Sequence, residues 1–331
     1  MDALSIICLD CGKPLDLSRS DAAICTGCRK RYPVTFGIPD MRGPLADTDP
    51  AEAVIVERML ALYPQTDFAG LVDARLRFDP HFGDLRGHEV GYLLSLNARG
   101  RGMIEMFHTR AADFFPPAGT DAALDIGCGS GASLLVLAGR YKAIAGLDPS
   151  LPDLILARKA LETAGLANFT LVQAYGQRIP FAGESFNFAN ALNVIEHVFD
   201  PEPVLREVRR VLKPGGIFAA DSRNRYDLFL PEPHVKIRWV GFVPRRWQKR
   251  YVRWRAGGSY DATRLLSYTD LRQALRSSFE RDYRIVFPLV DAYGGPEWMN
   301  GWLRQLERLP LLPALVLWFF PAHLALARRS Q

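Results

Sequence analysis

The fold of this chain is decided by the stretch Leu124-Asp125-Ile126-Gly127-Cys128-Gly129-Ser130-Gly131-Ala132. An apolar strand pattern ends in this stretch, an apolar helix pattern begins after it, and three glycines lie in the turn between them. Glycine allows positive φ angles and close approach of a ligand, and the first turn of a helix offers free N–H groups. The stretch therefore predicts a cofactor-binding turn, although its spacing alone also fits dinucleotide sites.

Two acidic residues bear on the kind of cofactor. Asp125 precedes the first glycine by two residues, where a carboxylate would repel a pyrophosphate and attract a cationic amino group. Asp148 closes the apolar segment 143–147, where an acid can accept hydrogen bonds from ribose hydroxyls. Dinucleotides and S-adenosylmethionine both contain that ribose, so of these two acids only Asp125 distinguishes between the cofactors. It favours S-adenosylmethionine, which has an ammonium and a sulfonium group and no phosphate.

Further motifs follow the turn in a fixed order. They are Pro180-Phe181, Ser185-Phe186-Asn187, Asn193-Val194-Ile195-Glu196-His197-Val198 and Arg210-Val211-Leu212-Lys213-Pro214-Gly215-Gly216. With these motifs, the segment of roughly residues 122–221 closely resembles the class I S-adenosylmethionine-dependent methyltransferases, in particular the type 11 group. The resemblance implies a doubly wound, mostly parallel seven-stranded sheet of Rossmann-like methyltransferase fold, a methyl-transferring enzyme, and S-adenosyl-L-methionine as its cofactor.

The resemblance also implies a set of cofactor-binding residues, in which the acids and glycines hold the methionine and ribose parts. These residues are Asp125, Gly127, Cys128, Gly129, Gly131, Asp148, Pro149, Tyr175, Gln177 and Asn193. Two positions depart from the family pattern. Tyr175 stands where relatives usually have an acid for the adenine amino group, and Asn187 replaces the usual aspartate of S-F-D. Backbone groups, Gln177 or ring contact would then hold the adenine.

Four of the five cysteines form two C-x-x-C pairs near the start of the chain, at Cys8, Cys11, Cys25 and Cys28. Two such pairs predict a zinc ribbon, in which four thiolates hold a structural Zn²⁺ and stabilise a module with little core of its own. A pair of disulfides and a redox motif are the alternatives. The continuation 31–40 resembles the "YP…GIPD" ending of the small zinc-ribbon module often fused in front of bacterial methyltransferases, where its role is structural or partner docking.

The rest of the chain predicts three parts: a zinc-ribbon module at 1–42, a helical lead-in or cap at 43–120, and a methyltransferase domain at 121–331. Apolar spacing predicts helices over 53–63 and 103–115 in the lead-in. In the third part, strand and helix patterns alternate, which predicts a mostly parallel sheet. The segments are 122–126, 132–139, 143–147, 152–164, 169–173, 186–192, 201–212 and 217–221, with a helix at 267–277 and strands at 282–290 and 323–329.

Local signals set some of these boundaries. Asp200 with Pro201 predicts a helix start, and the sequence at 213–216 predicts where that helix stops. Ser267 and Asp270 predict a capping box. The pattern is interrupted between these helices, so residues 223–264 are interpreted as an insertion over the acceptor site.

Basic and aromatic residues alternate in this insertion. Between His234 and Arg255 lie eight lysines and arginines together with Trp239, Trp247, Tyr251 and Trp254. Such a stretch can bind single-stranded RNA, an anionic small acceptor or a lipid head-group surface. The plainer alternative is a solvated basic helix whose tryptophans pack on the domain. A net charge of only +5 is modest for a protein that must bind RNA.

A second apolar segment, 309–327, has no charged residue if His323 is neutral. Its length suggests a membrane span, but Pro310, Pro313 and Pro321 divide it. We expect a buried helix followed by a strand, with an interfacial membrane segment or a true span as alternatives.

Composition places the protein in an ordinary class. Apolar residues make up 48% and charged residues 23%, which excludes disordered and fibrous classes. The first residues lack a basic start followed by an apolar core, so no secretory signal is supported. The sequence predicts a cytoplasmic protein, with peripheral contact at the inner face of the membrane through the insertion or 309–327 left open.

Two histidines are candidate general bases. His197 follows the fourth parallel strand, and His234 lies at the start of the insertion. His197 could instead only orient its loop, and His234 could be an ordinary surface residue. The hypothesis is an enzyme that methylates a small-molecule, lipid-linked or glycan acceptor by direct displacement. The alternatives are an RNA (rRNA or tRNA) methyltransferase and a noncatalytic cofactor-binding partner protein.

Overall fold

A seven-stranded sheet lies at the centre of the computed structural model. Its strands, in spatial order, are β10 (Tyr283–Val286), β11 (Ala322–Arg328), β9 (Leu212–Arg223), β8 (Phe186–Ala191), β5 (Thr120–Ile126), β6 (Tyr141–Asp148) and β7 (Phe169–Gln173). β11 is antiparallel to both neighbours, and the other pairs are parallel. The predicted doubly wound, mostly parallel sheet is confirmed.

The structure describes residues 4–43, 50–78, 90–91, 94–95, 100, 102–107, 112–114, 120–232, 234–257, 260, 263–288, 298–306, 308–309 and 312–330.

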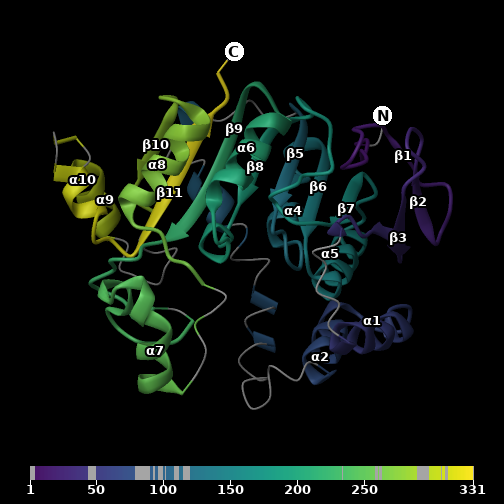
Figure 1. The fold of residues 1–331 in the computed structure, drawn as a ribbon, viewed down its shortest axis with the longest axis horizontal. Helices are drawn as coiled ribbons and strands as arrows, with labels where there is room; N and C mark the ends of the chain where they lie inside the picture. Colours follow the sequence, from purple (N-terminus) through teal and green to yellow (C-terminus); the bar gives the residue numbers. More distant parts are fainter. Residues whose placement is uncertain are drawn as a thin grey trace.

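Helices cover both faces of this sheet (Figure 1). On one face lie α4 (Ala132–Leu137) and α5 (Leu151–Thr163), with α1 (Pro50–Leu62) and α2 (Phe68–Phe78) packed outside α5. On the other face lie α6 (Pro201–Val211) and α8 (Tyr268–Phe279). Each layer contributes its own hydrophobic cluster against the strands, so the two faces of the sheet are buried by different helices.

Capping residues fix where these helices begin. The Asp200 carboxylate accepts a hydrogen bond from the Glu202 N–H at 3.1 Å. Ser267 and Asp270 form the predicted capping box of α8. Ser150 caps α5 by accepting from the Asp153 N–H. Each cap satisfies an N–H group that has no partner within the helix.

Some boundaries differ from the prediction. α6 ends at Val211, and β9 begins already at Leu212, so the 213–216 turn lies within a strand that was predicted to begin at 217. In the lead-in, helical residues are described at 102–107 and a 3-10 turn, η3, at Ala112–Phe114. The parts of the predicted 103–115 helix at 108–111 and 115 lie outside the described residues, and the three domain boundaries stay a prediction.

The four-cysteine module packs against the β7 edge of the sheet. It is a small sheet of β1 (Leu15–Asp16), β2 (Ala22–Cys25), β3 (Arg31–Thr35) and β4 (Ile38–Pro39). The Met41 N–H donates to the Gln173 carbonyl at 2.7 Å, and the Ile7 N–H donates to the Pro180 carbonyl at 2.9 Å. Buried side chains of the module, among them Tyr32, belong to the same hydrophobic cluster as α6 and the sheet. The module therefore continues the core of the domain.

The insertion and the following C-terminal helices lie at the other end of the sheet (Figure 1). The insertion holds the 3-10 turn η5 (Val240–Phe242) and α7 (Arg245–Ala256), which pack around a separate small cluster. α9 (Trp298–Leu306) and α10 (Leu312–Leu317) form another cluster with Phe287 and Phe320. The alternative that the insertion's tryptophans pack on the domain does not hold for Trp254, which is 77% exposed, whereas Trp239 lines a pocket together with Pro321.

The C-terminal apolar segment forms α10 and β11, as the helix-plus-strand prediction expected. β11 is buried, whereas Leu315 on α10 is exposed. His323 is buried in β11 beside the Leu317 carbonyl, 2.8 Å from its Nε2, and burial lowers its pKa to about 4. The ring is therefore neutral. Among the described residues, every helix is too short or too polar to cross a bilayer.

Candidate functional site at the ends of the parallel strands

The glycine turn follows β5 and requires glycine at each of its three positions. Gly127, Gly129 and Gly131 have φ angles of +67°, +48° and +86°, which other residues rarely adopt. A Cβ on Gly127 would lie 2.4 Å from Val194 Cγ2. Around a Cβ placed on Gly129, by contrast, the described part of the chain leaves 4 Å of open space. The turn is thus closely packed at Gly127 and open at Gly129, where a ligand can lie against the backbone.

Asp148 at the end of β6 faces this turn. Its Oδ2 accepts from the Gly129 N–H at 3.0 Å, and its Oδ1 accepts from the Ser150 N–H at 2.8 Å. Burial raises its pKa to about 7, and the nearby charge of Asp153 adds to the rise. Each carboxylate oxygen keeps a second lone pair. Asp148 can therefore accept hydrogen bonds from two neighbouring hydroxyls, as the predicted ribose contact requires.

Asp125 lies beneath the turn and is only 1% exposed. Its carboxylate accepts from the Ser133 hydroxyl of α4 and, at 2.7 Å, from the Asn190 amide of β8. Burial raises the pKa of Asp125 to about 7. The Asp125 carboxylate in β5 thus links β8 to α4. The sequence did not single out Ser133 or Asn190, although an asparagine within an apolar strand is a signal for a buried polar partner.

Asn193 follows β8 at the same edge of the sheet. It has a left-handed φ of +54°, and its N–H donates to Asp221 Oδ1 at 2.7 Å. Strained backbone of this kind is common at functional sites. Because Val194 also packs against Gly127, the structure places the Asn193 loop beside the glycine turn.

The remaining predicted cofactor residues surround this edge. Tyr175 is half-buried and Gln177 is exposed in the loop after β7, and Cys128 is buried within the turn. The Pro149 carbonyl accepts from Arg42 Nη1 at 3.2 Å. Arg42, which the sequence analysis missed, therefore links the end of the four-cysteine module to the residue after Asp148. The departure at Asn187 has a structural role away from this edge, since its side chain accepts from the N–H of Ala122 at the start of β5.

The two candidate histidines meet at the junction of the β8 loop and the insertion. Their rings lie edge to face with centroids 5.0 Å apart. The sequence analysis also missed Glu232. Its Oε1 atom lies 2.5 Å from Nδ1 of His234. Its Oε2 accepts from the N–H groups of His234 and Val235, both at 2.8 Å. A buried carboxylate thus fixes a partly exposed imidazole, and the E-x-H spacing was its only sequence signal.

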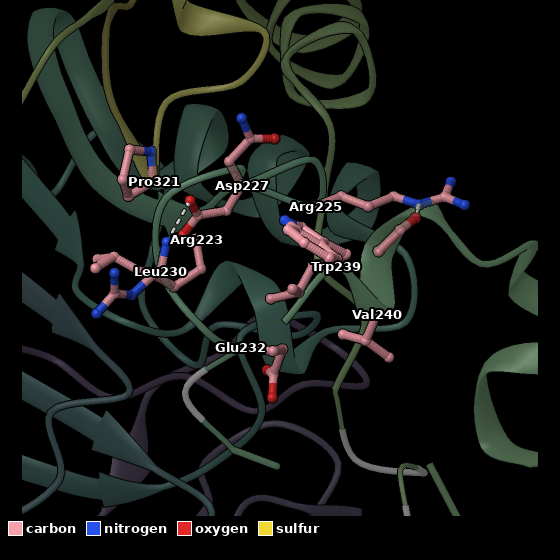
Figure 2. Close-up of a pocket in the computed structure, with 11 residues that line it drawn as sticks. Arg223, Arg225, Asp227, Leu230, Glu232, Trp239, Val240 and Pro321 are labelled. Atoms are coloured by element: carbon pink, nitrogen blue, oxygen red, sulfur yellow. Dashed lines mark hydrogen bonds between the residues drawn. The ribbon is translucent and has the colours of Figure 1, made fainter. Parts of the chain in front are cut away.

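A small pocket with an internal volume of only about 10 Å³ lies beside Glu232, the partner of His234. Figure 2 shows Arg223, Arg225, Glu232 and Trp239 among the residues that line it. Beside it, Glu196 is buried, and burial together with the charge of Asp221 raises its pKa to about 8. The pocket is therefore lined by one aromatic residue, two arginines and two acids, Asp227 and Glu232.

The four N-terminal cysteines converge at the tip of their module. Their Sγ atoms all lie within 4.8 Å of one another. The pairs Cys8–Cys28 and Cys11–Cys25 are 3.6 Å and 3.3 Å apart, whereas a disulfide requires about 2.0 Å. The cysteines are free thiols, so the structure does not contain the alternative pair of disulfides. Four thiols in this arrangement match the ligand set of a structural zinc site.

Comparisons with known proteins agree with this geometry. Residues 124–220 match the family described as "Methyltransferase domain". The ubiquinone biosynthesis O-methyltransferase of Cereibacter sphaeroides is 28% identical over 155 residues, which are 47% of this chain and 58% of that protein. The protein of the same name from Ruegeria pomeroyi is 32% identical over 133 residues, which are 38% of this chain and 52% of that protein. The chain thus spans only about half the length of these relatives.

Solved structures include a phosphoethanolamine N-methyltransferase 2 from Haemonchus contortus in complex with S-adenosyl-L-methionine. It aligns with a TM-score of 0.46 and 15% identity over 69% of this chain and 52% of that chain. The family match covers the glycine turn, Asp148 and the Asn193 loop. The match to the methyltransferase family therefore falls on the residues that form this edge of the sheet.

Proposed function

We propose that the protein is an S-adenosylmethionine-dependent methyltransferase that acts on a small-molecule acceptor. The observation that carries this proposal is the pairing of the open glycine turn with Asp148, whose carboxylate binds the turn at Gly129. When bound, S-adenosylmethionine supplies an electrophilic methyl group on a sulfonium. Gly127, Gly129 and Gly131 would hold its methionine part, and Asp148 would accept hydrogen bonds from its ribose.

The residues of the insertion favour a hydroxyl acceptor. A carboxylate can only accept a hydrogen bond, so in the tautomer that pairs with Glu232 the ring proton of His234 lies on Nδ1 and Nε2 carries the free lone pair. In this proposal Nε2 would take the proton of the acceptor hydroxyl, while bound S-adenosylmethionine would give up its methyl group to the oxygen and leave as the neutral thioether. Glu232 then stabilises the imidazolium, which returns the proton to water. Two relatives are named O-methyltransferases, which supports a hydroxyl group as the acceptor.

Residues that contact the glycine turn and the histidine pair are close together in the sequence. Val194 packs on the glycine turn, and His197 follows it by three residues and contacts the ring of His234. His197 is therefore proposed as a positioning residue for His234. Holding oxygen and methyl carbon in line contributes up to about 7–11 kcal/mol to such a reaction, and a general base adds about 10²–10⁴-fold in rate.

The N-terminal module is proposed to hold one structural Zn²⁺ on Cys8, Cys11, Cys25 and Cys28. Four thiolates leave no open position on the metal, so its role is to stabilise the module. Free thiols in this number also fit the reducing cytoplasm. Metal analysis of the purified full chain is expected to give one zinc per chain, and a folded protein without metal would contradict this assignment.

Cofactor binding is tested by titration calorimetry with S-adenosylmethionine. Asp148→Ala should weaken binding about 100-fold, because two hydrogen bonds to a charged acceptor are lost. Asp121→Ala, which removes an exposed carboxylate at the start of β5 that pairs with Lys213, is the matched control and should bind like the parent. Equal affinity in Asp148→Ala would overturn the ribose assignment.

The acceptor is tested by transfer of a labelled methyl group into fractionated cell extract. We expect the label in the metabolite, lipid or glycan fraction. Label confined to RNA would instead favour the RNA methyltransferase alternative. Cofactor binding without transfer to any fraction would favour the noncatalytic alternative.

A further inference from the structure

The most unusual surface of the molecule is formed by its tryptophans. All six lie in the insertion or in the C-terminal segment 298–318, and each is at least 42% exposed. Large apolar residues on the same segments are exposed as well. We call this set the aromatic face, and it consists of Leu228, Phe229, Leu230, Trp239, Phe242, Trp247, Trp254, Trp298, Trp302, Leu309, Leu315, Trp318 and Phe319. A concentration of exposed large apolar side chains on neighbouring segments can mark an interaction site.

Contacts join the two segments of the aromatic face. The Leu228 N–H donates to the Phe319 carbonyl at 3.4 Å. The Asn224 side-chain amide donates to the carbonyls of Leu317, Trp318 and Phe320 at 3.2, 2.8 and 2.8 Å. In Figure 2, Leu230, Trp239 and Pro321 border the same pocket. The start of the insertion therefore lies directly against the end of α10 and the residues that follow it.

Helix α7 adds a strong positive charge to this surface. Its sequence RRWQKRYVRWRA contains six basic residues and no acidic one. Gln248 and Val252 are its buried residues, and Trp247 and Trp254 lie seven residues apart, hence on one stripe that points away from that buried side. Arg250 lies over the ring of Trp247, and Arg255 lies over that of Trp254, at 5.8 and 5.9 Å from the ring centroids.

We infer that the aromatic face and α7 bind the surface of an anionic phospholipid bilayer. Tryptophan rings prefer the level of the lipid head groups, and the neighbouring guanidinium groups can bind lipid phosphates. The exposed leucines Leu228, Leu309 and Leu315 have no role in stacking on bases, so a bilayer fits this surface better than RNA. The contact is peripheral, because no helix among the described residues is long and apolar enough to span a membrane.

This inference is tested by sedimentation of the full chain with vesicles. One set contains phosphatidylglycerol and phosphatidylcholine in about equal amounts, and the other contains phosphatidylcholine alone. We expect binding to the anionic vesicles that weakens as salt is raised. Arg250→Glu/Arg253→Glu should reduce the affinity at least roughly fivefold for each charge changed. Trp247→Ala/Trp254→Ala should reduce it at least about tenfold.

Leu17→Ala is the matched control, because Leu17 is a similarly exposed apolar residue on the four-cysteine module. It should bind vesicles like the parent, and all variants should keep the parent's unfolding temperature. The inference is wrong if the parent protein does not bind anionic vesicles, or if the tryptophan and arginine variants bind them unchanged. Tighter binding to a single-stranded RNA oligonucleotide than to vesicles at the same salt would also overturn it. None of these results depends on catalysis, so they are separable from the proposed function.

Discussion

The two ends of the central sheet are covered in opposite ways. At the β7 edge, the four-cysteine module contributes Ile6, Tyr32 and Met41 to the same hydrophobic cluster as the sheet and α6. At the β10 end, the insertion packs around its own small cluster and leaves its tryptophans exposed. The four-cysteine module therefore belongs to the folding unit of the domain, whereas the insertion leaves apolar surface exposed to other molecules.

The strongest test of this contrast removes the metal ligands of the module. Cys25→Ser/Cys28→Ser should unfold the module, because structural zinc contributes on the order of 10 kcal/mol to modules of this kind. Since the core is shared, the methyltransferase domain should also lose stability, with its unfolding midpoint lowered by about 10 °C or more in calorimetry. Trp254→Ala at the other end should change the midpoint by less than about 2 °C. Equal midpoints for the cysteine variant and the parent would show that the module does not stabilise the domain.

The insertion end should affect rate rather than stability. His234→Ala is expected to lower the rate of methyl transfer by about 10²–10⁴-fold, because the acceptor hydroxyl loses its base. Glu232→Gln should lower it less, since the ring loses only its charged partner. Cofactor affinity by calorimetry and the unfolding midpoint should stay at the parent values. An unchanged rate in His234→Ala would remove the base from the proposal and leave the cofactor site intact.

The cofactor site near the module should show a pH dependence of its own. Burial raises the pKa of Asp148 to about 7, so below pH 7 the protonated acid predominates and accepts ribose hydroxyls poorly. Affinity for S-adenosylmethionine should therefore rise about tenfold per pH unit below pH 7 and level off above it. Proton release, measured by calorimetry in buffers of different ionisation enthalpy, should accompany binding near pH 6. Asp148→Asn should abolish both effects, and a pH-independent affinity in the parent would contradict the assignment.

The smallest expected effect tests the link between module and site. Arg42 is nearly buried, pairs with Asp40 at 2.9 Å and donates to the Pro149 carbonyl. Arg42→Ala should weaken cofactor binding about threefold, because the segment after Asp148 loses one hydrogen bond. Arg31→Ala removes an exposed arginine of the same module and should leave the affinity unchanged. If both variants bind alike, the module supports the fold without influencing the site.

Local patterns predicted the sheet well and the side-chain pairs poorly. Strand β7 was predicted with its observed bounds, and the caps at Asp200 and Ser267 are confirmed, because alternation and capping depend on neighbours in sequence. The start of β9 was placed five residues late, since the glycines at 215–216 suggested a turn where the structure continues a strand.

Long-range partners could not be predicted in the same way. The sequence named His197 and His234 separately, and only the fold shows that their rings meet. Likewise Arg42 lies 107 residues from Pro149 along the chain. No periodic pattern encodes such a contact, because it depends on how the module packs on the completed sheet.

The position of β11 between β9 and β10 has a consequence for synthesis on the ribosome. Until residues 322–328 have been translated, β10 has no partner strand and the backbone groups along β9 that later bind β11 are unsatisfied. A nascent chain at that stage exposes strand edges that promote aggregation. We therefore expect newly made chains to depend on chaperones until this late strand has inserted.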